Sequence, residues 1–436
     1  MVKLSIEKVQ FGSETLSEAR KKKILIVAHN HPLFFPGGAE IVAYDLFKAI
    51  GKEENEYQPF FLAATAGVSR TSREGTPFQM LVDSPNEVLF SGDSYDYFYH
   101  SQKVLKFIYS DFKSFLQQLQ PDIIHFHHIV RIGLEVLQIA RQVLPNVKIV
   151  YTIHEYLLMC YRDGQMVRTQ NNELCEYASP DRCHQCFPEF SPQQFKMREA
   201  FIKAHLELVD MFISPSHFLA NRFIQWGIPS DKMRVIENGR PITESAPHRV
   251  LVEGEKRNVF GYFGQINPYK GILVILEAVR FLVKNNYQDF RVEIFGNVAL
   301  GFPDFADQFL GFLHEFKDYV NYNGQYKLEE LKELIQPVDW VIVPSTWWEN
   351  SPLVIQEVFM HKRPIICSNI GGMAEKVEDQ VTGLHFRVGN AVSLAKTMQK
   401  ASSDAELWQQ LVNHIKPRLS IEDCLRYHTR LYDHLS

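Results

Sequence analysis

The sequence predicts an α/β protein with two doubly wound, Rossmann-like domains that face a central cleft. Three observations indicate this fold class. Short β-branched runs alternate with helical stretches, the alternation pauses at one polar segment and then restarts, and a chain of 436 residues exceeds what one hydrophobic core usually supports. Because ligands of open α/β sheets bind beyond the carboxyl ends of the strands, we expect the functional site in the cleft.

The first domain is predicted over residues 23–240, after an N-terminal extension of residues 1–22. Residues 24–28 form a short apolar run that suits a buried parallel strand, and a glycine loop leads from it into a helix that starts near Ala39. The same pattern then repeats. Strands are expected at 123–126, 148–153, 211–214 and 233–236, with helices at 101–118, 134–143 and 193–208.

A polar stretch at residues 241–257, which contains Pro241, Pro247 and Gly254, is predicted to be the linker. The second domain follows at residues 258–417, and a C-terminal helix at about 418–436 is expected to pack back on the first domain. Strands of the second domain are expected at 259–263, 291–295, 320–322, 340–343, 364–367 and 383–386.

Charge and hydropathy narrow the function classes. The formal net charge of −5 gives no broad attraction for nucleic acid, and no zinc-finger, RNA-recognition or basic-helix signature is present. No apolar run approaches the roughly 18 to 20 residues that span a bilayer. The N-terminal segment, with Glu7, Glu14 and Glu18, does not form a signal peptide, so we expect a cytoplasmic protein.

The segment 345–357 carries the most specific functional signal. Ser351 and Pro352 predict a helix start, because Ser is a favoured N-cap and Pro a favoured first helical residue. Backbone N–H groups at such a start attract an anion such as a diphosphate. Glu349 precedes the helix and Glu357 lies about 7 to 8 Å into it, so the two carboxylates can bind the hexose and ribose of a nucleotide sugar. The alternative interpretation is a helix with an acidic first turn.

Four of the six cysteines lie close together in the sequence. Two of them are separated by a gap of two residues, which lets two thiolates share a zinc ion, and the other two can complete a structural site. The alternative is a set of reduced, partly buried thiols. A catalytic zinc is not expected, because four protein ligands leave no open position. The four residues are Cys160, Cys175, Cys183 and Cys186.

Five motifs occur in a fixed order along the chain. They are 36–40 (Pro-Gly-Gly-Ala-Glu), 151–155 (Tyr-Thr-Ile-His-Glu), 236–239 (Ile-Glu-Asn-Gly), 264–271 (Gly-Gln-Ile-Asn-Pro-Tyr-Lys-Gly) and 349–357. Together they resemble the retaining GT-B glycosyltransferases of family four, also called glycosyl transferases group 1, over nearly the whole chain. In that family the C-terminal domain holds the nucleotide sugar and the N-terminal domain receives the acceptor.

The resemblance implies catalytic roles for three residues. Lys270 would stabilise the leaving diphosphate, His154 would contact the donor sugar at the reaction centre, and Glu349 would contact the donor hexose. Many relatives carry Arg where this chain has Gln265, so Gln265 is expected to bind through its neutral amide. The implied donor-binding residues are Gly37, Gly38, Gln265, Asn297, Gln325, Tyr326, Asn350, Ser351, Leu353 and Glu357.

The resemblance also implies the reaction. A hexose, with UDP-glucose as the first choice of donor, would pass with retention of configuration to a glycan or lipid-linked saccharide in cell-surface polysaccharide biosynthesis. No metal or other cofactor would be required. The alternative is a noncatalytic protein that binds a nucleotide sugar or a partner on the same scaffold. A dinucleotide-dependent oxidoreductase is disfavoured, because no G-x-G-x-x-G motif follows residues 24–28 or 259–263.

Residues 101–120 leave two interpretations open. Lys103, Lys106 and Lys113 lie among aromatic and aliphatic residues, as in a helix that rests on the inner membrane face near a lipid-linked acceptor. A packed surface helix has the same pattern.

Overall fold

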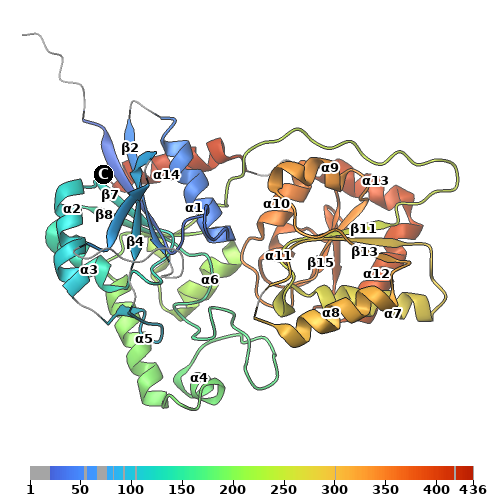
Figure 1. Cartoon of the computed structure of the whole chain (residues 1–436), viewed down its shortest axis with the longest axis horizontal. Helices are drawn as coiled ribbons and strands as arrows, with labels where there is room; N and C mark the ends of the chain where they lie inside the picture. The colour runs from blue at the N-terminus through green and yellow to red at the C-terminus, as the bar shows by residue number, and fades with distance from the viewer. Residues whose placement is uncertain are drawn as a thin grey trace, which may run out of the picture.

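The computed structural model has two α/β lobes that lie side by side (Figure 1). It describes residues 20–53, 56–65, 76–81, 83–91, 94–103, 106–299, 301–416 and 419–435. Most of the predicted N-terminal extension therefore lies outside the described residues. Each lobe is built on one mainly or wholly parallel sheet, so the predicted fold class of two Rossmann-like domains is confirmed.

The N-terminal lobe contains an eight-stranded sheet with the order β10-β9-β8-β7-β1-β2-β4-β3. The strand order reverses around β1, which pairs in parallel with both β2 and β7. Only the edge strand β3 is antiparallel to its neighbour. The strands are β1 (Lys22–Ala28), β2 (Tyr57–Thr65), β3 (Phe78–Leu81), β4 (Ser84–Ser91), β7 (Ile123–Phe126), β8 (Lys148–Thr152), β9 (Met211–Ser214) and β10 (Met233–Val235).

Helices cover both faces of this sheet (Figure 1). They are α1 (Gly38–Ile50), α2 (Lys113–Leu119), α3 (Glu135–Val143), α4 (Pro180–Cys186), α5 (Pro192–Leu206) and α6 (His217–Trp226). The last helix, α14 (Ile421–Leu435), returns from the other lobe and packs on α1. Its Asp433 also accepts hydrogen bonds from Lys22 of β1 and Tyr57 of β2, at 2.9 and 3.2 Å.

The C-terminal lobe has a six-stranded parallel sheet with the order β13-β12-β11-β14-β15-β16. Its strands are β11 (Val259–Phe263), β12 (Arg291–Phe295), β13 (Val320–Tyr322), β14 (Trp340–Val343), β15 (Ile365–Ser368) and β16 (Gly383–Phe386). The helices are α7 (Ile272–Lys284), α8 (Pro303–Glu315), α9 (Leu331–Ile335), α10 (Leu353–Met360), α11 (Gly371–Lys376), α12 (Ala391–Ser403) and α13 (Ala405–His414).

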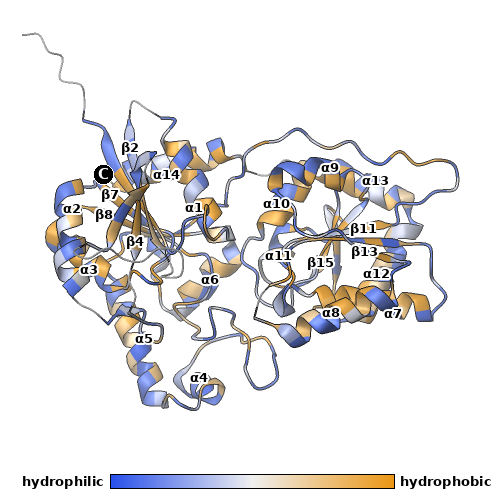
Figure 2. Ribbon diagram, viewed as in Figure 1, coloured by the Kyte–Doolittle hydropathy of each residue, from blue (hydrophilic) through white to orange (hydrophobic). Residues whose placement is uncertain are grey.

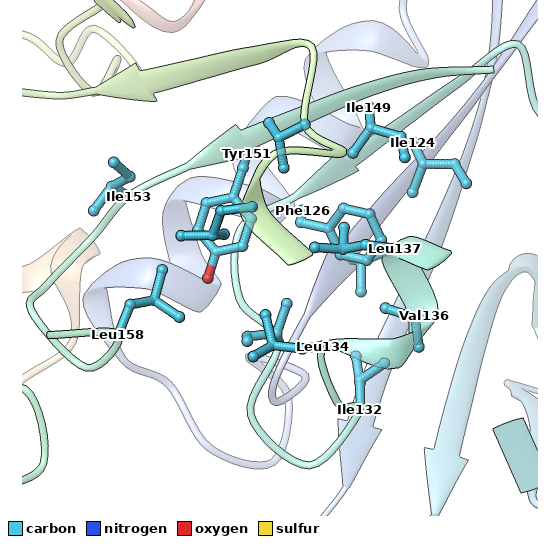
Figure 3. Packing of buried hydrophobic residues seen from close by; sticks show 14 of the residues in the cluster. Ile124, Phe126, Ile132, Leu134, Val136, Leu137, Ile149, Tyr151, Ile153 and Leu158 are labelled. Atoms are coloured by element: carbon cyan, nitrogen blue, oxygen red, sulfur yellow. The ribbon is translucent and has the colours of Figure 1, made fainter. Parts of the chain in front are cut away.

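Apolar side chains of the strands form the core of each lobe. Hydrophobic colour concentrates in the central strands of both lobes, whereas α4 and α5 carry long hydrophilic stretches (Figure 2). In the N-terminal lobe, side chains of β7 and β8 meet those of α3 and the loop before it (Figure 3). Buried residues of this cluster include Ile124, Phe126, Leu134, Ile149 and Tyr151. Burial on both faces explains why these strands have short continuous apolar runs.

Two parts of the N-terminal lobe differ from the sequence-based expectation. The sequence analysis assigned no strand to β2, β3 or β4, and β2 contains Pro59, a residue that is unusual in a central strand. Pro59 is tolerated since pairing of β2 with β4 begins only at Phe61. The expected helix 101–118 is also wrong at its start, where Ser101–Gln102 form the short strand β6 opposite β5 (Tyr95–Asp96), and a π-helical turn at Phe107–Phe112 precedes α2.

Within the described part of the chain, no helix is long and apolar enough to cross a membrane.

Candidate functional site

The helix α10 begins at the carboxyl end of β14, where the two lobes meet. Its N-cap is Pro352 and its first residue is Leu353, one residue later than the sequence suggested. The predicted Ser351 cap is wrong, because the Ser351 hydroxyl is buried and bonds to no described residue. The backbone N–H groups of the first turn and this hydroxyl therefore form a group of donors suited to an anion.

Lys270 and Glu349 form an ion pair beside the start of α10. Lys270 Nζ lies 2.6 Å from Glu349 Oε1, which also accepts hydrogen bonds from the Ser345 hydroxyl at 2.8 Å and the Trp347 indole at 2.9 Å. Burial alone would raise the pKa of Glu349, but the Lys270 charge and these hydrogen bonds outweigh it and lower the pKa. Glu349 is therefore ionised, and no described residue donates to its Oε2.

Glu357 lies one turn into α10 and pairs with an arginine from the end of the N-terminal lobe. Arg240 Nη2 lies 3.0 Å from Glu357 Oε1, and Arg240 Nη1 lies 2.7 Å from Asp45 Oδ2 on α1. Burial raises the pKa of Glu357 although the Arg240 charge opposes this. Burial, and then the charge of Glu357, raise the pKa of Tyr326. Glu357 and Tyr326 are thus neighbours beyond β13.

Three loops at the carboxyl ends of β11, β12 and β13 lie next to one another. Ile266 N–H donates to Asn297 O at 2.8 Å, and Gly296 N–H donates to Gly324 O at 2.7 Å. This arrangement brings together the exposed Gln265, Asn297 and Gln325, which were predicted to bind the donor. The Gln265 amide oxygen accepts from Asn267 Nδ2 at 3.1 Å.

Gly38, the second residue of the glycine pair, faces α10 from the other lobe. A Cβ atom added at Gly38 would lie 4.0 Å from Leu353 Cδ1, and one added at Gly37 would collide with Glu40 Oε2 at 2.5 Å. Two helix N-termini, those of α1 and α10, therefore approach the same place. Such convergence concentrates positive dipole ends, which favours an anionic group between them.

Asn350 joins the two lobes. Its side-chain amide donates to His154 O at 3.2 Å and its oxygen accepts from the Ser216 hydroxyl at 2.5 Å. The Asn350 side chain therefore forms hydrogen bonds between the lobes, whereas the resemblance implied a contact with the nucleotide sugar. Next to it, both oxygens of Glu375 accept from the first backbone N–H groups of α6, those of His217 and Phe218, at 2.9 and 2.7 Å.

His154 lies at the end of β8, at the interface between the lobes. Its Nε2 is 3.0 Å from His127 Nδ1, and the two rings stack. Burial, followed by the charges of nearby groups such as His128, lowers the pKa of His154 to about 3. His127 likewise has a pKa well below its usual value because of burial. Both imidazoles are therefore neutral at physiological pH.

His125 and His128, two further histidines near His154, have different partners. His125 lies between the Tyr432 and Thr152 hydroxyls at 2.7 Å each, so it packs β7 on α14. His128 Nε2 lies 3.3 Å from Glu155 Oε1. Burial raises the pKa of Glu155 to about 8.

Sequence reasoning did not assign a role to Glu40, the last residue of the glycine motif. Glu40 Oε1 lies 2.9 Å from His29 Nε2 and accepts from Asn30 Nδ2 at 3.2 Å. Burial would raise the pKa of Glu40, but the hydrogen bond and charge of His29 lower it to about 2. A carboxylate two residues after a pair of glycines that follows a strand was the available signal.

The segment between β8 and α5 reaches the C-terminal lobe. The Trp348 indole donates to Cys175 O at 3.1 Å, and the Trp348 ring lies 5.2 Å from that of Phe218 and 4.7 Å from the Arg222 guanidinium. Arg162 also approaches the Tyr269 hydroxyl at 3.5 Å. This segment therefore borders the Lys270 and Glu349 pair.

The predicted zinc site is wrong. Among the described residues, no three His, Cys, Asp or Glu side chains are placed to share a metal ion. Cys175 Sγ donates to Tyr177 O at 3.2 Å, and Cys186 Sγ donates to Gln170 Oε1 at 3.7 Å. The spacing of two residues puts two thiols on one turn of α4, but hydrogen bonds inside the segment engage the thiols separately. All four residues, Cys160, Cys175, Cys183 and Cys186, are free thiols.

Comparisons with known proteins agree with this geometry. Residues 36–244 match the model described as Glycosyltransferase Family 4, and residues 245–418 match that described as Glycosyl transferases group 1. YtcC of Bacillus subtilis, named as a glycosyltransferase, is 23% identical over 51% of this chain and 58% of its own. The lipopolysaccharide 1,2-N-acetylglucosaminetransferase of Salmonella typhimurium is 24% identical over 45% of this chain and 54% of its own. The chain thus spans about half the length of the curated relatives it matches.

A solved structure of Anabaena HepE in complex with UDP has a TM-score of 0.68 and 16% identity, and covers 95% of this chain and 100% of that chain. At this identity the likeness shows the fold alone. The two family models adjoin at residues 244 and 245 and follow the order of the two lobes. The chain therefore belongs to the group 1 glycosyltransferases and has their GT-B fold.

Proposed function

We propose that this chain is a retaining glycosyltransferase that moves a hexose from a UDP-sugar, with UDP-glucose as first choice, to a saccharide. A glycan or lipid-linked saccharide of a cell-surface polysaccharide is the proposed acceptor. The C-terminal lobe, residues 258–417, holds the donor. The N-terminal lobe, residues 23–240 with the C-terminal helix, receives the acceptor, and residues 241–257 link them.

One observation carries the proposal. The ion pair of Lys270 and Glu349 lies beside the hydrogen-bond donors at the start of α10, which are backbone N–H groups and the Ser351 hydroxyl. The Lys270 side chain is still 31% exposed, so its ammonium can also contact a ligand phosphate. The amide groups near Leu353 and the Ser351 hydroxyl supply further donors. Together they can hold a diphosphate and stabilise the charge that develops as the sugar leaves.

The proposed contacts with the sugar and with the nucleoside lie on the two sides of this phosphate site. Glu349 Oε2 is available to accept from a hexose hydroxyl, and Glu357 is placed one turn further along α10 for the ribose. The base would lie against the loops that contain Asn297, Gln325 and Tyr326. The HepE structures, which contain UDP, UDP with glucose, or UDP-glucose, support the choice of donor.

The proposed reaction proceeds on one face of the sugar. The bond between the anomeric carbon and the β-phosphate oxygen breaks, and the acceptor oxygen bonds to the same face of that carbon. The acceptor proton passes to the departing β-phosphate oxygen. Lys270 and the α10 dipole supply the positive charge, so we expect turnover without an added divalent cation. The neutral His154 can hydrogen-bond the donor sugar without adding charge.

The test is release of UDP from a panel of UDP-sugars mixed with saccharide acceptors, with product detected by mass spectrometry. Glycosylated product with retained anomeric configuration supports the proposal. Saturable UDP binding without product from any donor would favour the noncatalytic alternative. Addition of a chelator separates metal-independent transfer from transfer that stops without a divalent ion.

A further inference from the structure

Arg131 lies in the loop after β7 and contacts the residues that follow β1. Its Nη1 donates to Asn30 Oδ1 at 2.6 Å, and the Asn30 amide nitrogen donates to Glu40 Oε1. The Glu40 side chain lies against Gly37, and Gly38 faces Leu353 at the start of α10. A continuous set of contacts therefore leads from the proposed phosphate site to Arg131 on the acceptor lobe.

The Arg131 guanidinium is partly buried and has no carboxylate partner among the described residues. Among the residues that the structure describes, its side-chain partner is the neutral amide of Asn30, while Glu40 is engaged by His29 and Asn30. Arg141 and Arg249, by contrast, are partly buried and end on carboxylates. A cation that is always protonated and only singly bonded leaves its remaining N–H donors for an anion.

The backbone of Arg131 is also held in an unusual conformation. Its φ angle is +66°, in the left-handed region that residues other than glycine rarely adopt. The Arg131 carbonyl accepts a hydrogen bond from the Gln102 side chain, which belongs to the short strand β6. Conformational strain that neighbouring residues hold in place is common where a side chain must be aimed at a ligand.

From these contacts we infer that the acceptor carries an anionic group, a carboxylate or a phosphate, which Arg131 binds. The inference rests on the proposed function and adds the chemical class of the acceptor. Arg131 presents a planar set of donors that matches either oxyanion with two parallel hydrogen bonds. Asn30 fixes one edge of the guanidinium and leaves the other edge for the acceptor.

The test measures binding of small probes by saturation-transfer NMR in the presence of saturating UDP. The probes are methyl glucuronide, methyl glucoside 6-phosphate and the neutral methyl glucoside. We expect wild-type protein to bind the anionic probes about 10- to 100-fold more tightly than the neutral one. The carboxylate and phosphate probes distinguish the two sources of the charge.

The Arg131→Gln variant should lose this preference, and Arg131→Lys should keep part of it, because the charge remains without the planar donors. Arg234→Gln is the matched control, since Arg234 is exposed and bonds only to the carbonyl groups of Asp231 and Met233. An unchanged melting temperature shows that each variant folds, and unchanged UDP affinity shows that Arg131 does not bind the donor diphosphate.

Equal binding of charged and neutral probes by the wild type would overturn the inference, as would an Arg131→Gln preference equal to that of the wild type. A tenfold loss of UDP affinity in that variant would overturn it too, by assigning Arg131 to the donor. These results leave the proposed function intact. Failure of every UDP-sugar to release UDP would instead count against the proposed function.

Discussion

Two groups of side chains between the lobes, the ion pairs at α10 and the imidazoles at β7 and β8, differ in their electrostatics. The C-terminal face carries full charges in pairs, with Lys270 on Glu349 and Arg240 on Glu357. The N-terminal face around β7 and β8 carries imidazoles whose pKa values burial depresses, as at His154. The ion pairs suit the proposed diphosphate site, whereas the neutral imidazoles suit the proposed place of attack by an acceptor hydroxyl.

This difference teaches that burial alone does not decide ionisation at the site. Burial acts to raise the pKa of both Glu349 and Glu155, yet the pKa of Glu349 is lowered and that of Glu155 is raised to about 8. One carboxylate oxygen of Glu349 accepts hydrogen bonds from the Lys270 ammonium and from two neutral groups, the Ser345 hydroxyl and the Trp347 indole. Glu155 has a neutral imidazole, that of His128, as its side-chain partner.

The largest expected effect comes from the charged face. Lys270→Ala should lower kcat by about 100- to 1,000-fold, because it removes the cation beside the leaving diphosphate. It also leaves the buried Glu349 without its counter-ion, so a melting curve should accompany the UDP-release assay. Lys270→Arg should recover part of the rate. Lys332→Ala, at an exposed pair with Glu244, is the control. Transfer within threefold of wild type by Lys270→Ala would contradict the role of this charge.

A smaller effect is expected at the second ion pair of the same face. Glu357→Gln should weaken UDP binding about tenfold, measured by calorimetry, because a charged acceptor for the ribose hydroxyls becomes neutral. Asp45→Asn is a matched control, since Asp45 pairs with the other end of Arg240. If both variants weaken UDP equally, the effect comes from Arg240, and Glu357 has no direct contact with the nucleotide.

The contact between the faces can be weakened without touching either ion pair. Glu375→Gln removes a charge that caps the N-terminus of α6 across the lobes, and we expect a loss in kcat/KM of about three- to tenfold. Small-angle scattering should show a larger radius of gyration. Glu378→Gln is the control, because no described residue pairs with the Glu378 side chain. An unchanged radius and rate would show that Glu375 does not hold the lobes together.

The smallest expected effect concerns the neutral face. Because burial raises the pKa of Glu155 from 4.5 to about 8, the folded state keeps a proton that the unfolded chain releases above pH 4.5. Stability from this group therefore falls as pH rises from about 4.5 to about 8. Relative to wild type, Glu155→Gln should gain about 1 to 3 kcal/mol over that window in urea unfolding. A difference that stays constant with pH would contradict the raised pKa.

Sequence patterns predicted much of the fold but not all of it. Strands buried on both faces, such as β7 and β8, were visible because their apolar runs are short and β-branched. Strand β2 was hidden by Pro59, since only the register with β4 shows that this residue needs no hydrogen bond on that side. The start of α10 was misplaced by one residue because Ser351 is buried at the interface instead of capping the helix.

The site was predictable only in part. The spacing of the motifs predicted Glu349, Glu357 and Lys270 as site residues, and the structure pairs Lys270 with Glu349, while their roles stay predictions. Arg240 and Glu375 were missed, since their partners lie on the other lobe, more than 100 residues away in the sequence. The cysteine cluster shows the opposite error, because close spacing in sequence did not place three ligands around one metal position in the described part of the chain.

The sequence by itself determined two parallel sheets, the helix start after β14 and the residue types that can bind a diphosphate. These depend on local apolar periodicity and capping chemistry, which neighbouring residues decide. Only the tertiary structure decided that Asn350 joins the lobes, that His154 is neutral and that Arg131 bonds to Asn30 and to no carboxylate among the described residues. Each of these properties depends on burial and on partners distant in the chain, and the spacing of residues in a sequence fixes neither.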